Sequence, residues 1–275
     1  MKTLLIAFAL VAGCSTTALA WNDRGHSVVT EIAYRHMTDH ARAQVQEILG
    51  NRTMDSLASW ADDFKYTKEG AYSKPWHFIS FPYDGDDQYT DKLCPAEGCV
   101  VSAIRDLSQK VTDPAVSAAD RETDLKLLIH IVGDSTMPFH CVDKGDHGAS
   151  DIMAEMHFHY PDKTDFPTGT YSVHHIWDDY LVDTGYWSWG TYAAILDEKV
   201  VPTLSTPQLD GDFAAVWINE CHAVGKAMYQ ALPTPRADGT YLLDGTYQDA
   251  MRPVVDKQLA TGGLRLAALL NKIFP

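Results

Sequence analysis

Residues 128–140 read Leu-Ile-His-Ile-Val-Gly-Asp-Ser-Thr-Met-Pro-Phe-His, and the fold can be predicted outward from them. Apolar residues dominate the segment from Asp124 to Gly133, which predicts a central, buried helix. On such a helix His130 and Asp134 lie four residues apart, so both side chains project from one face. Burying an imidazole and a carboxylate is costly unless a partner satisfies them.

The same spacing recurs in a second segment. Gly133 and Pro138 predict a turn after the central helix, which can bring His140 back toward it. His174 and Asp178 are again four residues apart. Either pair alone is also compatible with a helical hydrogen bond or a solvated face, because polar pairs at this spacing are common. Two pairs and a returning histidine together favour a zinc site, since zinc binds imidazole nitrogen and carboxylate oxygen.

The overall charge supports a metal as the source of positive potential. The 275 residues contain 22 Lys and Arg, 37 Asp and Glu and 12 His, for a formal charge of -15. A hydrophobic fraction of 45% with 21% charged residues excludes a disordered chain, a coiled coil and a collagen-like fibre. A protein that coats nucleic-acid phosphates with Lys and Arg should be basic, and this one is not. If phosphate is the ligand, bound metal must supply the charge.

The first 20 residues predict a secretory signal peptide. Lys2 precedes an apolar run, and the segment ends in Ala-Leu-Ala at residues 18–20, so cleavage there would leave Trp21 as the mature N-terminus. Val-Ala-Gly-Cys at residues 11–14 resembles a bacterial lipobox, and lipidation of Cys14 is the alternative. No other apolar run approaches the length of a membrane span. We therefore expect a secreted or periplasmic protein without stable membrane association, and a monomer.

Four cysteines lie outside this leader, and an even number in an exported chain indicates disulfides, here two. Four cysteines can be paired in three ways. A short loop containing a proline and a glycine favours Cys94–Cys99, and elimination then pairs Cys141 with Cys221. A cysteine-rich zinc site is the weaker alternative, since no Cys-x-x-Cys is present.

Helical spacing recurs along most of the remaining chain, which predicts one mostly α-helical domain over residues 21–275. A loop-rich insertion is expected at 143–173, with a short strand pair between Met153 and Tyr160. The expected helices span residues 30–49, 56–65, 100–111, 124–133, 174–182, 192–200, 211–232 and 246–272.

In this order the motifs resemble the zinc-dependent single-strand nucleases and 3′-nucleotidases typified by the fungal nucleases S-one and P-one, a family whose fold is shared by the zinc phospholipases C. The resemblance extends to residues 263–271, which look like the family's last helix. The matching positions are Trp21, His26, Trp60-Ala-Asp62, Trp76-His77-Phe78, His130, Asp134, His140, His174 and Asp178.

The resemblance implies an all-α fold with a trinuclear zinc cluster. The first zinc would take Asp62, His77, His130 and Asp134. The third would take the α-amine and carbonyl of Trp21 with His26 and the shared Asp134. The second would take His140, His174 and Asp178. A water bridging the first and third ions, oriented by Asp62, would attack phosphorus in line. The free amine of Trp21 would require removal of the leader before the third zinc binds.

Two residues near this cluster are expected to contact substrate. The family places a cation at the position of Lys65, where it would stabilise phosphate charge, and an aromatic ring at Phe78, where it would stack on a base. A solvated lysine and a core phenylalanine are the structural alternatives. Ser80 stands where the family often has an Asp that reads the base edge, and Gly148-Ala-Ser150 replaces a Gly-Gly-Asn segment. These departures bear on base preference.

The resemblance therefore implies hydrolysis of single-stranded DNA and RNA to 5′-phosphate products and removal of the 3′-phosphate from 3′-nucleotides. A zinc phospholipase C is the nearest alternative, although Asp178 stands where that branch usually has Glu. A non-catalytic secreted zinc protein is the second alternative, against which the predicted ligand set leaves positions open for water. The other seven histidines are expected to be structural or at the surface: His36, His40, His147, His157, His159, His175 and His222.

Overall fold

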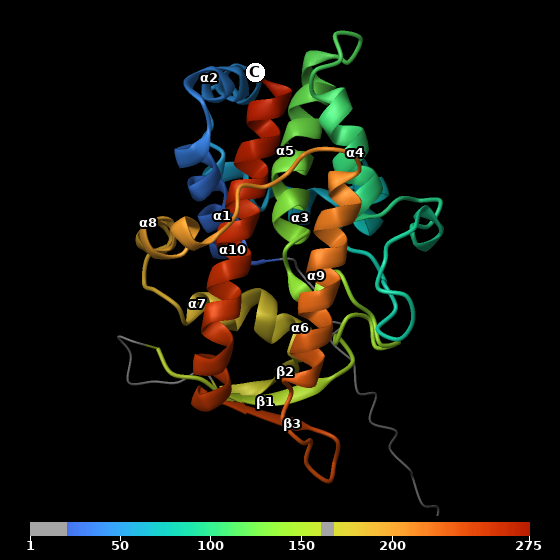
Figure 1. Ribbon diagram of the computed structural model, residues 1–275, viewed down its shortest axis with the longest axis vertical. Coiled ribbons are helices and arrows are strands. Elements are labelled where there is room, and N and C mark those ends of the chain that lie inside the picture. The colour runs from blue at the N-terminus through green and yellow to red at the C-terminus, as the bar shows by residue number, and fades with distance from the viewer. Residues whose placement is uncertain (1–20, 161–167) are drawn as a thin grey trace, which may run out of the picture.

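The computed structural model describes residues 21–160 and 168–275, so the predicted leader, with Cys14, lies outside the described residues. The chain forms a layered bundle of helices with a small sheet at one end (Figure 1). The helices are α1 Asp23–His36, α2 Asp39–Leu49, α3 Trp60–Phe64, α4 Val100–Lys110, α5 Ala118–Asp134, α6 Val173–His175, α7 Leu181–Asp183, α8 Trp189–Lys199, α9 Phe213–Gln230 and α10 Gly245–Ile273.

Helix α5 is the centre of the core, as predicted. Ser117 caps its first turn by accepting a hydrogen bond from Asp120 N, and every residue from Asp124 to Asp134 is buried. Helices α1, α2, α3, α4 and α10 pack around it, and α10 runs the length of the molecule beside it (Figure 1). Burial on all sides places the polar residues of the last two turns of α5 in the interior.

Gly133 allows the close approach of α1 to α5. A Cβ atom at this position would lie 2.9 Å from Nδ1 of His26, closer than real Cβ contacts allow. The small residue therefore brings the imidazole of α1 against the last turn of α5, where Asp134 lies.

The prediction of one helix over residues 30–49 is wrong, because the chain breaks at Met37 and Thr38. Both residues are extended, and the Thr38 side chain accepts a hydrogen bond from Ala41 N to start α2. The apolar rows continue across the break, which is why periodicity alone does not reveal it. The helix expected over 56–65 is likewise divided, into a 3₁₀ turn at Asp55–Leu57 and α3.

The sheet differs from the predicted strand pair within residues 153–160. Strand β1, Met153–His157, pairs antiparallel with β2, Thr168–Ser172, and parallel with β3, Tyr241–Asp244. The strand order is therefore β2-β1-β3. The predicted region supplies only the central strand, and one partner comes from far along the chain. Among the described residues, no helix has both the length and the apolar character needed to cross a bilayer.

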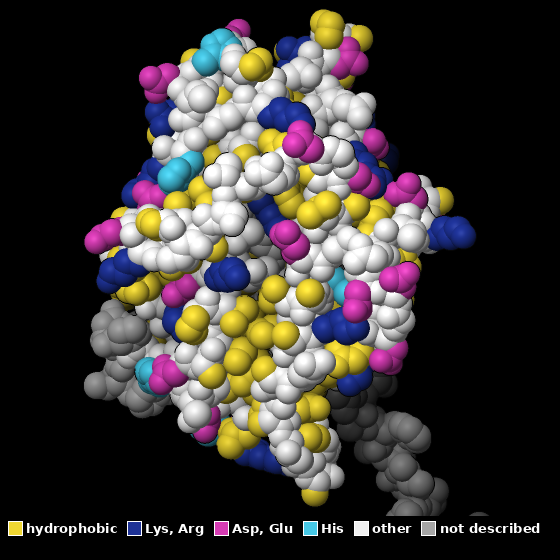
Figure 2. All heavy atoms as spheres, in the orientation of Figure 1, with side chains coloured by type: hydrophobic (Ala, Val, Ile, Leu, Met, Phe, Trp, Pro, Cys, Tyr) yellow, Lys and Arg dark blue, Asp and Glu magenta, His cyan; other side chains and the backbone are white. Residues whose placement is uncertain are grey.

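Acidic and basic side chains are interspersed over the face that carries α9 and α10, and Figure 2 shows no region of a single charge there. Hydrophobic side chains gather over the lower half of this view, between α9 and α10. This face therefore lacks the continuous basic surface that would bind a polyanion by charge alone.

Candidate metal centre

Eight predicted ligand side chains come from separate elements and meet in the interior. All eight are buried. Helices α1, α3, α5 and α6 supply five of them; short 3₁₀ turns at Ala71–His77 and Pro138–His140 and a π-helical turn at Ile176–Tyr180 supply the other three. The residues are His26, Asp62, His77, His130, Asp134, His140, His174 and Asp178.

Five of these side chains form one cluster around the end of α5, which we call the α5 cluster: His26, Asp62, His77, His130 and Asp134. His130 Nε2 lies 3.5 Å from Asp62 Oδ1 and 3.3 Å from Asp134 Oδ2. His77 Nδ1 lies 2.9 Å from the same Asp134 oxygen. His130 Nδ1 donates a hydrogen bond of 2.7 Å to the Ala58 carbonyl, which turns Nε2 toward the carboxylates.

Asp134 divides its two oxygens between two groups of ligands. Oδ2 faces His77 and His130, whereas Oδ1 lies 3.3 Å from His26 Nε2. The rings of His26 and His130 stack with centroids 3.9 Å apart. Two three-residue sets that could each hold an ion therefore overlap here, one containing His26 and Asp134 and the other Asp62 and His77, with His130 in both. A carboxylate in this position can bridge two ions.

The other three side chains, His140, His174 and Asp178, form the His140 cluster. His174 Nε2 lies 3.2 Å from Asp178 Oδ2. His140 Nδ1 donates to the His77 carbonyl at 2.8 Å, and His174 Nδ1 donates to the Gly148 carbonyl at 2.6 Å. Both rings are thus held by backbone oxygens so that the other nitrogen is the one available to a metal.

The loop that supplies the Gly148 carbonyl has an unusual backbone. His147, Gly148 and Ala149 have φ values of 55°, 60° and 63°, in the left-handed region. A Cβ atom on Gly148 would lie 2.3 Å from the Phe139 carbonyl oxygen. Glycine is therefore required at this position, and the two neighbouring residues are strained. Such strain is found where a function fixes the backbone.

Buried atoms without partners show that the donor set fits a metal. In the part of the chain that the structure describes, no hydrogen-bond partner satisfies Asp134 Oδ1 or either oxygen of Asp178, and the Nε2 atoms of His26, His77 and His174 are equally unsatisfied. Buried polar groups are rarely left in this condition. A tetrahedral ion with bonds of about 2.0–2.2 Å separates its ligands by about 3.4 Å. Four of the five nitrogen–oxygen distances given above between histidine and carboxylate, at 3.2–3.5 Å, are close to that value. The fifth, between His77 Nδ1 and Asp134 Oδ2, is shorter at 2.9 Å.

The buried carboxylates of the α5 cluster also favour binding of a cation. Burial opposes protonation of His130, but the carboxylates of Asp134 and Asp62 outweigh it and raise its pKa to about 10. Although burial opposes their ionisation, the charge of His130 holds the pKa of both carboxyls well below the usual range. The metal-free cluster thus draws in a proton to balance its carboxylates, a charge that a divalent cation would supply instead.

In the His140 cluster burial sets the direction of the pKa shift for His140 and Asp178, whereas for His174 burial opposes protonation and the Asp178 carboxylate nevertheless raises the pKa. Burial lowers the pKa of His140 to about 3 and raises that of Asp178 to about 7. Burial likewise lowers the pKa of His77, in the α5 cluster, to about 4. His77 and His140 are therefore neutral at physiological pH, the form in which imidazole binds a metal.

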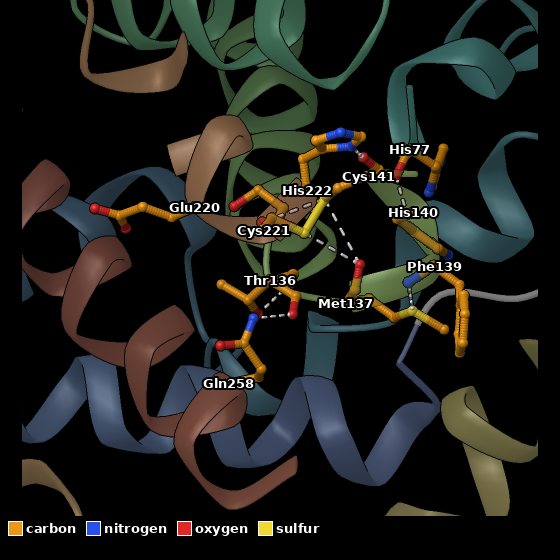
Figure 3. Close-up of a disulfide and its surroundings, with 12 residues drawn as sticks. His77, Thr136, Met137, Phe139, His140, Cys141, Glu220, Cys221, His222 and Gln258 are labelled. Carbon is orange, nitrogen blue, oxygen red and sulfur yellow. Dashed lines mark hydrogen bonds between the residues drawn. A yellow bond between two sulfur atoms is a disulfide. The ribbon is translucent and has the colours of Figure 1, made fainter. Parts of the chain in front are cut away.

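A disulfide supports the His140 cluster from behind. Cys141, directly after His140, is bonded to Cys221 of α9, and Figure 3 shows the bond beside Met137 and His222. Gln258 of α10 donates a hydrogen bond of 2.7 Å to the Thr136 carbonyl in the same turn. Together they tie the turn after α5 to two long helices. The second predicted disulfide, Cys94–Cys99, is also present.

An open cavity of about 300 Å³ lies against the two clusters. His77, His140 and His174 contribute to its wall together with Lys65, Phe78 and Ser80. Phe78 exposes 45% of its surface, so its interpretation as a core residue is wrong. Lys65 is not a solvated lysine either: it is 5% exposed and its Nζ donates to Asp62 Oδ1 at 2.6 Å.

Trp21 is fully buried beside the clusters. Its indole Nε1 donates to Thr136 Oγ1 at 3.3 Å, and the next backbone amide, Asn22 N, donates to the Asp178 carbonyl at 3.0 Å. The first described residue therefore contacts the turn after α5 and is adjacent in the chain to a contact with the segment that carries Asp178.

Several residues of the cavity wall were not predicted from the sequence, and among them are three polar residues. Tyr66, Lys74 and Asp143 line it beside the predicted residues. Lys74 had a detectable signal, because it precedes His77 by three residues and the two share a face in a 3₁₀ helix. Asp143 lies in the loop-rich segment, where nothing in the sequence indicates which way a side chain points.

Buried histidine–carboxylate clusters beside an open cavity, on a mostly helical fold, are typical of a metal-dependent hydrolase. The chain belongs to the S1/P1 nuclease family, whose model matches residues 21–275. It is 27% identical to Nuclease S1 of Aspergillus oryzae, over 99% of this chain and 98% of that protein.

Other relatives agree. Nuclease P1 of Penicillium citrinum is 27% identical over 92% of this chain and 97% of its own, and Endonuclease 3 of Arabidopsis thaliana is 26% identical over 99% and 94%. The predicted family is thereby confirmed, and the chain is a nuclease, a hydrolase acting on nucleic acids.

Proposed function

We propose that this chain is an exported zinc-dependent nuclease and 3′-nucleotidase. In this proposal it hydrolyses single-stranded DNA and RNA to 5′-phosphate products and removes the phosphate from 3′-nucleotides. The observation that carries the proposal is the placement of two buried, unsatisfied histidine–carboxylate clusters at the wall of an open cavity. The two disulfides support export, because such bonds persist in oxidising compartments.

The side chains of the α5 cluster would hold two ions, and the His140 cluster would hold a third. Zinc bound at these sites would supply Lewis-acid charge and acidify a water at neutral pH. Trp21 would complete the ligand set through its amine and carbonyl once residues 1–20 are removed. The domain would then comprise residues 21–275.

The chain's own side chains would position the phosphate and the nucleophile. Asp62, held by the Lys65 ammonium, has an oxygen facing His130 and would orient the attacking water. Lys65 would place positive charge at the cavity wall, where it favours the developing charge on phosphate. The exposed ring of Phe78 would stack on a base without selecting its identity.

The relatives reported above are named nucleases and endonucleases, which favours nucleic acid over phospholipid as the substrate. The cavity beside the clusters favours catalysis over a structural use of zinc, since structural zinc sites are closed. Monomeric behaviour remains part of the proposal.

Metal removal tests this proposal with the purified mature protein. We expect about three zinc ions per chain by mass spectrometry of the metal, hydrolysis of single-stranded DNA, RNA and 3′-AMP, and complete loss of all three activities on chelation. Because metal binding stabilises the folded state, the melting temperature should fall as well, and added zinc should restore both.

Phosphatidylcholine, tested as a further substrate, distinguishes a nuclease from a phospholipase C. Preferential hydrolysis of this lipid would contradict the nuclease assignment of substrate, and full activity in metal-free protein would contradict the role of the clusters. N-terminal sequencing of the exported protein should begin at Trp21; a lipidated start at Cys14 would remove the proposed role of the Trp21 amine.

A further inference from the structure

A short basic and aromatic segment borders the cavity in an otherwise acidic protein. Residues 65–76 read Lys-Tyr-Thr-Lys-Glu-Gly-Ala-Tyr-Ser-Lys-Pro-Trp, with three lysines against one glutamate in a chain of formal charge -15. Lys65 has a partner in Asp62. Tyr66 and Lys74 line the same cavity and have no part in the proposed catalytic set.

The local helix explains the position of Lys74. Residues Ala71–His77 form a 3₁₀ helix, in which side chains three residues apart lie on one face. Lys74 is therefore aligned with His77, a member of the α5 cluster. The 3₁₀ helix therefore places the Lys74 side chain at the cavity wall.

Among the residues that the structure describes, none neutralises the charge of Lys74. Within residues 21–160 and 168–275, no carboxylate forms an ion pair with it, whereas the Lys65 ammonium is 2.6 Å from Asp62 Oδ1. Lys74 Nζ instead lies 5.2 Å from the centroid of the Tyr66 ring. A free ammonium at the wall of a phosphodiester-binding cavity is complementary to a second phosphate.

Tyr66 provides the flat surface beside this charge. Its side chain is 49% exposed, and Lys65 Nζ lies 5.6 Å from the centroid of its ring. The same ammonium donates to Asp62 of the α5 cluster. An exposed tyrosine flanked by cations is the combination that single-stranded nucleic acids engage, through base stacking and backbone charge.

We propose that Tyr66 and Lys74 form a second nucleotide subsite for single-stranded polymers. The Tyr66 ring stacks on the base next to the one held at Phe78, and the Lys74 ammonium binds a backbone phosphate outside the cleaved bond. This inference rests on the proposed function and adds to it a determinant of polymer over mononucleotide substrates.

The test compares two substrates with the zinc-loaded enzyme: 3′-AMP, which fills one subsite, and a ten-residue oligoadenylate, which fills both. We expect Lys74→Gln to raise the KM for the oligonucleotide about tenfold more than the KM for 3′-AMP. The slope of log(kcat/KM) for the oligonucleotide against log[salt] should become shallower by about 0.7, as for the loss of one single-strand phosphate contact. Tyr66→Leu should raise the oligonucleotide KM in the same selective way without this change in slope.

Two further variants serve as controls. Lys74→Arg retains the charge and should restore most of the oligonucleotide affinity. Lys257→Gln removes an exposed lysine of α10 that does not line the cavity, and should leave both substrates and the salt slope unchanged. Equal effects of Lys74→Gln on the two substrates, or an unchanged oligonucleotide KM and slope, would overturn the subsite. Failure of the wild type on both substrates would instead contradict the proposed function.

Discussion

Asp178, which is fully buried, and Asp256, which is half-buried, show two ways in which this protein accommodates a carboxylate away from solvent. Asp256, on α10, accepts a hydrogen bond from the Tyr192 hydroxyl. Arg252 in turn donates to that hydroxyl at 3.2 Å and to Thr184 Oγ1 at 3.0 Å. Asp178 is more deeply buried, and neither of its oxygens has a hydrogen-bond partner in the described part of the chain. The Nε2 atom of its neighbour His174 lies 3.2 Å from Asp178 Oδ2 without making a hydrogen bond to it.

This difference distinguishes a structural carboxylate from a candidate metal ligand without the use of any related protein. The Asp256 network balances its own polar atoms and needs nothing further to be stable. The two clusters are incomplete, because several buried atoms await a ligand. Burial of titratable groups is therefore not the informative feature; burial without partners is.

Matched substitutions of the two carboxylates should show the largest difference. Asp178→Asn should lose about one metal equivalent and at least about 100-fold in kcat/KM, because its cluster loses a charged ligand. The metal-free variant should be no less stable than metal-free wild type, since a costly buried carboxyl is removed. Asp256→Asn should retain metal and activity but lose about 1–3 kcal/mol of unfolding free energy.

Metal analysis, steady-state kinetics and denaturant unfolding measure these effects. Full metal content in Asp178→Asn, or loss of metal in Asp256→Asn, would show that the contrast between the two sites is mistaken.

A backbone substitution should have a smaller effect. Gly148→Ala places a Cβ atom 2.3 Å from the Phe139 carbonyl oxygen, so the loop must shift, and we expect the Gly148 carbonyl to move away from His174 Nδ1. We expect affinity for the metal of the His140 cluster to fall about 10–100-fold, as when an outer-shell partner is lost. Competition with a fluorescent zinc chelator measures this change.

Gly145→Ala is the matched control. Gly145 also has a positive φ, 82°, but a Cβ atom there would meet nothing within 4 Å. The control should lose some stability through backbone strain and retain metal affinity. Equal affinities in the two variants would mean that the carbonyl does not orient His174.

The smallest predicted effect is a change in proton release with pH. Burial raises the pKa of Asp178 to about 7 in the metal-free protein, so this carboxyl is mostly protonated at pH 6 and mostly ionised at pH 8. Metal must displace that proton, so binding should release more protons at pH 6 than at pH 8, by up to about one per chain. Calorimetry in buffers of different ionisation enthalpy counts them, and the difference should shrink in Asp178→Asn.

Much of the site could be predicted because its ligands lie in local patterns. The pairs His130 with Asp134 and His174 with Asp178 follow helical spacing, and the short loop between Cys94 and Cys99 fixes one disulfide and, by elimination, the other. Those elements needed no knowledge of contacts distant in sequence. The family's order of motifs supplied the remaining ligands, including His26 and Asp62.

Features that depend on long-range packing could not be predicted. Strand β3 pairs with β1 across more than eighty residues, and its four residues carry no alternation by which a short strand would be recognised. The carbonyls of Ala58 and Gly148 orient their histidines, but any backbone oxygen offers the same chemistry. By contrast, the break between α1 and α2 could have been predicted, because Thr38 followed by the acidic Asp39 is a helix start signal.

The Cys141–Cys221 bond has a practical consequence for anyone who makes this protein. It spans 80 residues of sequence and ends next to His140. By chain entropy a closed loop of this length contributes about 4.5 kcal/mol to stability. A recombinant host whose cytosol keeps thiols reduced would yield molecules that lack this disulfide behind the His140 cluster, one of the candidate metal sites. Secretion into the periplasm or culture medium, or refolding with an oxidant, is the route by which homogeneous, fully loaded enzyme should be obtained.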